Sequence, residues 1–500
     1  MPNVNREEMF ARLRHRGTPW DVLIIGGGAT GLGCAVDAAS RGLSTALVER
    51  FDFASGTSSR STKLIHGGVR YLRGGQVGLV AQSLRERERL RKNAPGLVRA
   101  IDFLVPTRRP FGRAFYALGL GLYDALSGGA GATRVLSRSA VRERVPGVAM
   151  DGLRGGVVYR DDQFDDARLA LALARTAADL GAVVLNYAAV ESLVEKNGRV
   201  AGAVVRDAET GAVLEVPARA VINATGVHAD DIRRLDDPDA EPIIRTSRGA
   251  HIVLDRSFLP GNTAVLIPRT DDGRVVFLIP WRGRVLVGTT DTESGITDDP
   301  VATQQDIEFL LAHAGRVLER APTLDDVRSA FAGLRPLLRQ GHGRTASLSR
   351  DHQVFVSARG LVTITGGKWT TYRSMAEDAV DRAVAATELS TRRSRTATLA
   401  IHGGDVDAWS NDPAELLAMG SDGVDIDGFV SAMARDAMAR TVEDVLARRS
   451  RALYLDARGS IALAPVVARA LAPELGRDPG WIEQEAANFS ARAASWLPPR

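Results

Sequence analysis

The chain has 500 residues, of which 45% are hydrophobic and 25% are charged, a composition typical of a soluble globular protein with two or three domains. Its formal net charge is only +4, and basic residues alternate with acidic ones in segments such as RERERLRK, so we expect no nucleic-acid binding. The single cysteine, Cys34, excludes an intramolecular disulfide and a cysteine-rich metal site.

The first twenty residues are polar and rich in arginine, so we expect no signal peptide. Apolar runs such as residues 114–126 are too short to span a bilayer. The histidines at 228, 313, 342 and 352 lack the spacing of metal ligands, and we expect no metal site.

Residues 21–49 have the pattern of a nucleotide-binding unit. A hydrophobic strand leads into Gly26-x-Gly28-x-x-Gly31, an alanine-rich helix follows, and a second strand ends at Glu49. The first glycine permits the tight turn, the second lets the backbone approach a pyrophosphate, and the third lets the helix pack on the strand. The helix N-terminus then faces the phosphates, and Glu49 can accept hydrogen bonds from ribose hydroxyls.

Two later segments supply further strand ends that carry glycine. Residues 181–205 and 219–230 predict strands that lead to Ala-Thr-Gly at 224–226, and residues 361–372 predict a strand, two glycines and a helix start. An NAD-binding protein would continue into regular βαβ units, whereas this chain enters a loop rich in serine and threonine. Three glycine-bearing strand ends suit a long ligand, so the sequence favours FAD over NAD.

That loop, TSSRSTKLIHGGVRYL at 57–72, combines hydroxyls with cations and an imidazole. Only four of the 64 basic residues in the chain are lysines, namely Lys63, Lys92, Lys196 and Lys368. In a chain that otherwise uses arginine, a lysine indicates a need for a compact ammonium group or has no special role. Lys63 lies in this loop and Lys368 lies in TITGGKWTTYR, so both are candidate functional residues.

The pattern changes between residues 249 and 290, where alternating strands separated by turn residues predict antiparallel hairpins. Helices are expected over 303–321 and 368–389, and a helix-rich region follows a polar linker near 391. The predicted fold is α/β, with a discontinuous Rossmann-like FAD-binding domain, an antiparallel substrate-binding sheet domain and a C-terminal helical domain. The predicted domain ranges are 18–100, 151–240 and 351–390 for FAD, 101–150 and 241–350 for substrate, and 391–500 for the helical domain.

Several long motifs resemble those of the FAD-dependent, quinone-linked glycerol-3-phosphate dehydrogenase family. They are SSRSTKLIHGGVRYL, NATGVHADDI, VFLIPWRGRVLVGTTDTE, GLRPL at 333–337 and GGKWTTYR, with LYLDARGSIALAPVVARALAPELG in the C-terminal region. The resemblance implies oxidation of sn-glycerol 3-phosphate to dihydroxyacetone phosphate, with hydride passing from C2 to flavin N5 and electrons passing to a membrane quinone. A glycerol-3-phosphate oxidase that uses oxygen and a non-catalytic flavoprotein remain alternatives.

The resemblance also implies which residues hold the cofactor. The expected FAD-binding residues are Gly26, Gly28, Gly31, Glu49, Ser58, Ser59, Ser61, Thr62, Lys63, His66, Gly67, Gly68, Val190, Gly226, Gly367, Lys368 and Thr370. For Lys63 the sequence leaves open a simple ion pair with a nearby carboxylate.

Arg70, Tyr71, Arg335 and Lys368 are the expected substrate-binding residues. Arginine forks and a lysine suit a phosphate that carries nearly two negative charges. The expected catalytic residues are His251, Arg335 and Lys368, with His251 as the base because a strand holds an imidazole rigidly. His66 is the alternative base.

Each of these assignments has a structural alternative. Arg335 precedes Pro336 and could cap a turn, Tyr71 could be a core aromatic, and a histidine on a strand is often structural.

A quinone acceptor implies contact with a membrane. Residues 111–126 are largely apolar. Arg108 and Arg109 precede this segment and Arg113 lies near its start, and these positive charges suit acidic lipid headgroups. We therefore expect a cytoplasmic protein, peripheral on the inner face of the cell membrane, and a homodimer is possible. A buried helix of the substrate domain is the alternative for this segment.

Overall fold

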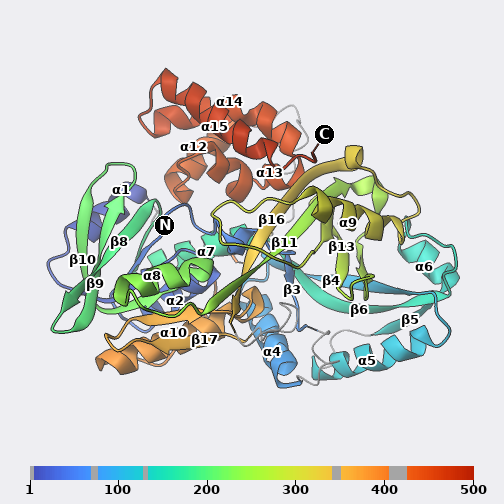
Figure 1. Ribbon diagram of the computed structural model, residues 1–500, viewed down its shortest axis with the longest axis horizontal. Coiled ribbons are helices and arrows are strands. Elements are labelled where there is room, and N and C mark those ends of the chain that lie inside the picture. Colours follow the sequence, from blue (N-terminus) through green and yellow to red (C-terminus); the bar gives the residue numbers. More distant parts are fainter. Residues whose placement is uncertain (1–4, 69–76, 128–132, 340–350, 405–424, 500) are drawn as a thin grey trace.

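Two sheets and a group of C-terminal helices make up the computed structural model (Figure 1). It describes residues 5–68, 77–127, 133–339, 351–404 and 425–499. The predicted α/β class with C-terminal helices is confirmed.

The first sheet is the nucleotide-type sheet, with strand order β17-β18-β10-β1-β2-β7. Its strands β1, β2, β7, β10 and β18 run parallel, and β8 and β9 form an antiparallel extension on β10. The strand bounds are β1 Trp20–Ile25, β2 Thr45–Val48, β7 Val183–Leu185, β8 Ala188–Lys196, β9 Arg199–Asp207, β10 Val213–Asn223, β17 Gln353–Val356 and β18 Val362–Thr365.

The second sheet is mostly antiparallel, with strand order β15-β11-β14-β13-β12-β4-β6-β3, and with β16 and β5 paired to β11 and β6. The hairpins predicted between residues 249 and 290 are β11 to β14. The bounds are β3 Leu64–Ile65, β4 Val98–Thr107, β5 Arg134–Ser137, β6 Gly155–Phe164, β11 Ile244–Asp255, β12 Thr263–Ile267, β13 Val276–Trp281, β14 Arg284–Gly288, β15 Thr292–Glu293 and β16 Val327–Leu338.

Two strands lie in a different sheet from the one that their predicted domain range indicates. β3 and β6 fall within the ranges 18–100 and 151–240 predicted for the FAD domain, but they pair with each other in the second sheet. The chain crosses from one sheet to the other inside the serine-rich loop, which local patterns of hydrophobicity do not reveal. The exact domain bounds remain a prediction.

Helices cover both sheets. α2, α7 and α10 pack in the core of the first sheet, α9 packs on one face of the second, and the C-terminal helices pack on its other face. The helix bounds are α1 Arg6–Arg14, α2 Ala29–Ser40, α4 Val77–Asn93, α5 Gly112–Leu126, α6 Arg138–Arg144, α7 Asp166–Asp179, α8 Ala229–Asp236, α9 Gln304–Gly315, α10 Tyr372–Thr387, α12 Ile426–Ala437, α13 Ala452–Leu455, α14 Ala457–Glu474 and α15 Pro479–Ala494.

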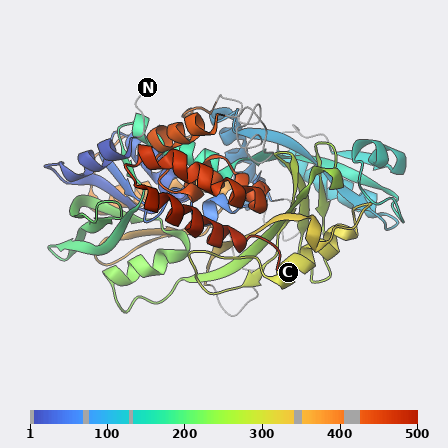
Figure 2. The ribbon, with the colours of Figure 1, turned by 90° about the horizontal axis from the view of Figure 1, so that it is seen from above.

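Strand β11 shows why the second sheet is covered on both sides. Ile252 and Leu254 are buried in the core shared with α9, whereas Val253 between them is buried in the core shared with α13 to α15. Successive side chains of a strand point to opposite faces, so a run of apolar residues here requires two covering layers. Figure 2 shows the C-terminal helices lying across the middle of the molecule.

The contact between β1 and α2 leaves no space for a side chain at Gly31. A Cβ atom there would lie 1.9 Å from the carbonyl oxygen of Gly26, which itself has a left-handed φ of +108°. The glycine pattern predicted this close packing of helix on strand.

We expect Gly31→Ala to lower the free energy of unfolding by about 1–3 kcal/mol, because backbone must move to admit the methyl group. Urea titration measures this change, and the FAD content of the purified protein should fall with it. Gly78→Ala is the matched control, since a Cβ at Gly78 in α4 meets nothing within 4 Å and alanine favours a helix. Equal stability of the two variants would contradict the role of the contact.

Candidate active site

A cavity of 2210 Å³ runs between the two sheets. Its walls come from the ends of β1 and β2, the loop 54–68, β11, β16, the turn 366–370, the C-terminal helices and α5. Segments far apart in the sequence therefore meet around one space, as the three predicted glycine-bearing strand ends required.

The first turn of α2 is a cradle for an anion. Gly28 precedes the helix and supplies no side-chain cap, so first-turn amides beyond that of Ala29 can serve a ligand. The Ser58 hydroxyl accepts a hydrogen bond from the Ala29 amide at 2.9 Å. Gly26 and Gly28 line the cavity here, and a dinucleotide pyrophosphate fits this donor set.

Glu49 follows β2 and also lines the cavity. It accepts hydrogen bonds from the amides of Gly27 at 2.6 Å and Phe51 at 2.8 Å. Burial raises the pKa of Glu49, against these two hydrogen bonds. The amide contacts fix the carboxylate beside α2, where it can still accept from ribose hydroxyls.

The turn at 366–370 joins the serine-rich loop. Gly366 and Gly367 have left-handed φ values, and Lys368 precedes the short helix η6 (Trp369–Thr371). The Trp369 indole donates to the Ser58 carbonyl at 2.8 Å. Lys368 is half-buried and lines the cavity, so one of the two candidate functional lysines lies at the site.

His251 lies on β11 with its imidazole on the cavity wall. Its Nε2 is 2.9 Å from the Thr62 hydroxyl, and its ring stacks on Phe331 with centroids 4.9 Å apart. The Nδ1 atom is buried and has no hydrogen-bond partner among the described residues. A Cβ at Gly288 would lie 2.1 Å from the ring, so this glycine makes space for the imidazole.

Burial lowers the pKa of His251 well below its ordinary value, and the positive charges of Lys63 and Arg335 lower it further. The imidazole is therefore neutral near pH 7 and can accept a proton. A neutral imidazole is what a general base requires.

Arg335 lies on β16 and lines the same cavity. Its Nη2 donates to the Thr289 hydroxyl at 2.9 Å and to the Thr290 carbonyl at 3.1 Å, and its Nη1 is 3.7 Å from Asp291. A Cβ at Gly249 would lie 2.2 Å from Nη2. These contacts place the guanidinium at the cavity rather than in a turn cap.

Most of the predicted site residues meet around this cavity. Those that line it are Gly26, Gly28, Glu49, Ser58, Ser61, Thr62, His66, Gly68, Gly226, His251, Arg335, Gly367, Lys368 and Thr370. Arg70 and Tyr71 lie outside the described residues.

The other predicted cofactor residues do not line the cavity. They are Gly31, Ser59, Lys63, Gly67 and Val190. The Lys63 side chain is fully buried in an ion pair with Asp166 at 2.7 Å, which is the alternative that the sequence left open. Val190 packs against the core of the first sheet.

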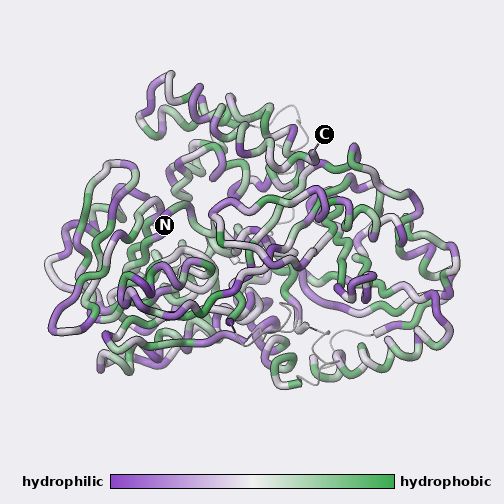
Figure 3. The backbone as a smooth tube through the Cα atoms, in the orientation of Figure 1, coloured by the Kyte–Doolittle hydropathy of each residue, from purple (hydrophilic) through white to green (hydrophobic). Residues whose placement is uncertain are grey.

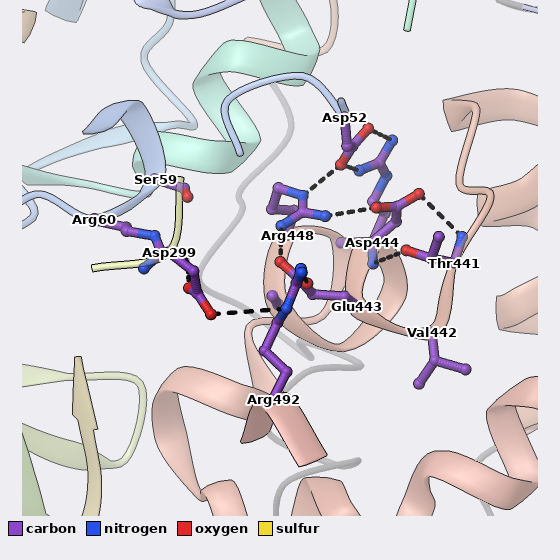
Figure 4. Close-up of polar contacts among 12 residues, drawn as sticks. Asp52, Ser59, Arg60, Asp299, Thr441, Val442, Glu443, Asp444, Arg448 and Arg492 are labelled. Carbon is purple, nitrogen blue, oxygen red and sulfur yellow. Dashed lines mark hydrogen bonds and ion pairs between the residues drawn. The ribbon is translucent and has the colours of Figure 1, made fainter. Parts of the chain in front are cut away.

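A network of alternating charges at the cavity wall was not foreseen from the sequence (Figure 4). Asp52 follows β2 and pairs with Arg448 and Arg449 of the π-helix η7 (Asp444–Arg449). The network continues through Glu443, Arg492 and Asp299 to Arg60 of the serine-rich loop. It ties the C-terminal helices to the FAD side of the cavity.

Burial opposes the ionisation of Asp52, but Arg449 and Arg448 outweigh it and hold its pKa below the ordinary value. Arg448 and Arg492 likewise lower the pKa of Glu443 to about 2 despite its burial. Both carboxylates are therefore charged at every physiological pH.

Helix α5 closes one end of the cavity and exposes an apolar face. Phe111, Phe115, Leu118 and Leu122 are 89%, 67%, 80% and 53% exposed, and all four line the cavity end. Their spacing of four, three and four residues puts them on one side of a helix. Figure 3 shows the largely apolar α5 at an edge of the molecule.

Within the described residues, no helix is long and apolar enough to cross a membrane. The four exposed side chains also rule out the alternative of a wholly buried α5.

Comparison with known proteins identifies a matching family and several similar sequences. The family described as FAD-dependent oxidoreductases (DAO) matches residues 21–373. Mitochondrial glycerol-3-phosphate dehydrogenase of Homo sapiens is 44% identical over 418 residues, or 80% of this chain and 57% of that protein. The Arabidopsis thaliana counterpart is 47% identical over 387 residues, or 74% and 62%. The chain thus spans about three fifths of the length of these relatives.

Two solved structures resemble this chain. Glycerol-3-phosphate dehydrogenase from Bacillus halodurans, complexed with FAD, is 28% identical, with a TM-score of 0.80 over 100% of this chain and 99% of that chain. L-α-glycerophosphate oxidase from Mycoplasma pneumoniae is 19% identical, with a TM-score of 0.59 over 76% and 97%. The second comparison shows a shared fold alone.

We expect Asp52→Asn to lower the free energy of unfolding by about 3–5 kcal/mol, because it leaves two buried guanidiniums without their carboxylate. A carboxylate with a lowered pKa stabilises the fold above its ordinary pKa near 3.9. The difference between wild type and variant should therefore be full at pH 7 and shrink below about pH 4. Urea titration at several pH values measures it.

Asp298→Asn is the matched control, since Asp298 pairs with Arg50 at the exposed rim. Exposed pairs contribute about 0–1 kcal/mol. If the free energy of unfolding falls no more in Asp52→Asn than in this control, the network does not hold the C-terminal helices in place.

Proposed function

The chain belongs to the family of FAD-dependent oxidoreductases, and from this premise we propose that it oxidises sn-glycerol 3-phosphate to dihydroxyacetone phosphate and delivers the electrons to a quinone. The FAD expected from the sequence is confirmed by the family match. The substrate is supported by relatives named glycerol-3-phosphate dehydrogenase. One observation carries the proposal: a neutral imidazole and two cationic side chains line the cavity that holds the FAD cradle.

FAD would be held by Gly26, Gly28 and the first turn of α2 at its pyrophosphate and by Glu49 at a ribose. When bound, FAD supplies the acceptor for the hydride that leaves C2 of the substrate. The chain itself must bind the phosphate, orient the alcohol and take its proton.

The phosphate would bind to Arg335 and Lys368. A phosphate monoester carries nearly two negative charges, and a guanidinium fork with an ammonium group is the usual cationic pair for it. Arg335 keeps its orientation through Thr289 and Thr290, so it is preorganised before substrate arrives.

His251 would take the proton of the C2 hydroxyl as hydride leaves C2 and the carbonyl forms. Stacking on Phe331 and the contact with Thr62 fix the orientation of the ring. The positive charge of Lys368 would also stabilise the negative charge that develops on the oxygen.

The electrons would leave to a quinone in a membrane that contacts α5. The exposed apolar face of α5 suits the acyl region of a bilayer, and the exposed Arg108, Arg109 and Arg113 suit anionic headgroups. The protein would thus be peripheral on the inner face of the cell membrane. An oxidase would instead be reoxidised by air as fast as by quinone, and stopped-flow reoxidation distinguishes the two.

Anaerobic addition of glycerol 3-phosphate should bleach the yellow colour of the wild-type protein.

We expect Arg335→Ala to lower kcat/KM for this substrate by about 10²- to 10⁴-fold, because charge-assisted hydrogen bonds of about 1.5–3 kcal/mol each are lost. Part of the loss should appear in kcat, since binding energy from the remote phosphate assists the reaction at C2. Stopped-flow flavin reduction measures both constants.

Glycerol serves as the control substrate, because it lacks the phosphate and should react poorly and almost equally with wild type and variant. The FAD content should stay near that of the wild type. An equal loss on both substrates would place Arg335 at the reacting carbon, and loss of FAD would make it a cofactor ligand; each result contradicts the phosphate assignment.

For α5, we expect wild-type protein to float with anionic liposomes at low and moderate salt. Leu118→Glu should weaken binding by at least about tenfold, or 1.4 kcal/mol, because a charge replaces an apolar side chain on the membrane face. The matched control is Leu235→Glu, an exposed leucine at 40% on helix α8, which should bind as wild type does. If the wild type fails to float, or if both variants lose liposome binding equally, α5 is not the membrane-contact helix.

A further inference from the structure

Lys63 is a fully buried lysine beside the candidate active site. Its exposed fraction is 0%, and its backbone has a left-handed φ of +62°, a conformation that costs free energy in a residue other than glycine. Its Nζ donates to the Ser59 carbonyl at 2.5 Å and pairs with Asp166 at 2.7 Å. The substrate and cofactor contacts proposed above make no use of it.

The ammonium of Lys63 is a surplus charge of a buried cluster. Asp165 and Asp166 begin α7, Arg282 lies in the turn between β13 and β14, and Arg451 precedes α13. Arg451 pairs with Asp166 at 2.8 Å and Arg282 pairs with Asp165 at 3.0 Å. Among these members two carboxylates pair with two guanidiniums, Arg168 on α7 adds a further positive charge near Asp165, and Lys63 adds one more when it is protonated.

The cluster reaches His251 through two contacts. Thr62, the residue before Lys63, is 2.9 Å from His251 Nε2. Phe331 stacks on the imidazole and also lies 5.4 Å from Lys63 Nζ, and Tyr454 lies 4.6 Å from the same ammonium. The lysine charge and the imidazole therefore share one desolvated environment, in which charges interact strongly.

We propose that Lys63 is a positioning residue whose buried ammonium keeps His251 neutral and thereby ready to accept the substrate proton. The proposal rests on the proposed function, in which His251 is the base. Lys63 acts on the imidazole through its charge and touches neither substrate nor cofactor.

The titration of the two groups supports this role. Burial lowers the pKa of Lys63 to about 7, with Arg451 adding to the effect and Asp166 opposing it. Burial, then Lys63, then Arg335 lower the pKa of His251. As the pH falls, Lys63 gains its proton first, and its charge then makes a second proton on His251 more costly.

This order explains a lysine in a chain rich in arginine. A guanidinium would add a permanent positive charge to this buried cluster. An amine adds its charge only below about pH 7, which is the range in which an ordinary imidazole gains its proton. Thr62 contacts the imidazole and the charge of Arg335 acts on it, and both residues remain in the variants below.

The test is the pH profile of kcat/KM for flavin reduction in Lys63→Met and Lys63→Gln holoenzymes. Without the nearby cation, the pKa of His251 rises, so the acid limb should move to higher pH by about one unit. The plateau value should stay within several-fold of wild type, since Asp166 keeps its ion pair with Arg451. Lys63→Arg, if it folds, should keep the wild-type limb, and exposed Lys92→Met should change nothing.

An unmoved acid limb with a uniform loss of kcat/KM at every pH would mean that Lys63 is only structural. NMR of carbon-13-labelled histidine Cε1 provides a readout independent of activity. With eight histidines in the chain, a His251→Gln variant identifies the resonance. The His251 resonance should titrate at higher pH in both neutral variants than in wild type.

The possible results separate the two proposals. An unchanged His251 titration overturns the role of Lys63, even if the wild type oxidises glycerol 3-phosphate. A shifted titration with an unmoved acid limb shows that His251 is not the base, and it overturns Lys63 as a positioning residue for catalysis. Failure of glycerol 3-phosphate to bleach the wild type overturns the proposed function while leaving the NMR titration interpretable.

Discussion

The close packing of α2 on β1 is the constraint on which the cavity depends. With no side chain at Gly31, the helix begins at the carboxyl end of the strand and its first amides face the cavity. The next segment then folds against this turn, through the Ala54 amide to the Gly27 carbonyl at 3.0 Å and through Ser58 to Ala29. The same loop continues to Thr62 and so reaches His251 in the second sheet.

Buried ion pairs, rather than apolar contacts alone, join the C-terminal helices to the two sheets. The junction consists of loops and helix ends, whose carbonyl groups need donors. Arginine supplies several donors at once: Arg449 donates to the Ala437 carbonyl and Arg451 to those of Ala447 and Ser59. Each guanidinium also pairs with a carboxylate, so removal of one partner leaves an uncompensated buried charge.

The sequence predicted those parts of the structure that depend on contacts between residues close together in the chain. The nucleotide unit was predictable because Gly26, Gly28, Gly31 and Glu49 act within one short βαβ segment. The hairpins of the second sheet were predictable from alternation and turn residues. The crossing of the chain at β3 was not, because a two-residue strand carries no periodicity.

The site shows the same division. Arg335 and Lys368 were identified through long motifs, whereas Asp52 with Arg448 was missed, since nothing local marks a pair of residues almost four hundred positions apart. Lys63 is the intermediate case. Its rarity as a lysine singled it out, but only the fold shows that Asp166 and Arg451 surround it.

Gly67, a residue expected to bind the cofactor, packs against α5 behind the cavity wall. A Cβ at Gly67 would lie 2.5 Å from the Tyr123 hydroxyl, and the Gly67 amide donates to that hydroxyl at 2.8 Å. Tyr123 lies on the buried side of α5 and donates to Asp161, which pairs with Arg87 at 2.5 Å. The helix with the exposed apolar face is therefore fixed by a buried hydrogen bond to the loop that precedes it in the cavity wall. Because an unpaired buried donor is costly, a shift of α5 would leave the Gly67 amide without its partner, so this contact couples the position of α5 to the backbone next to His66.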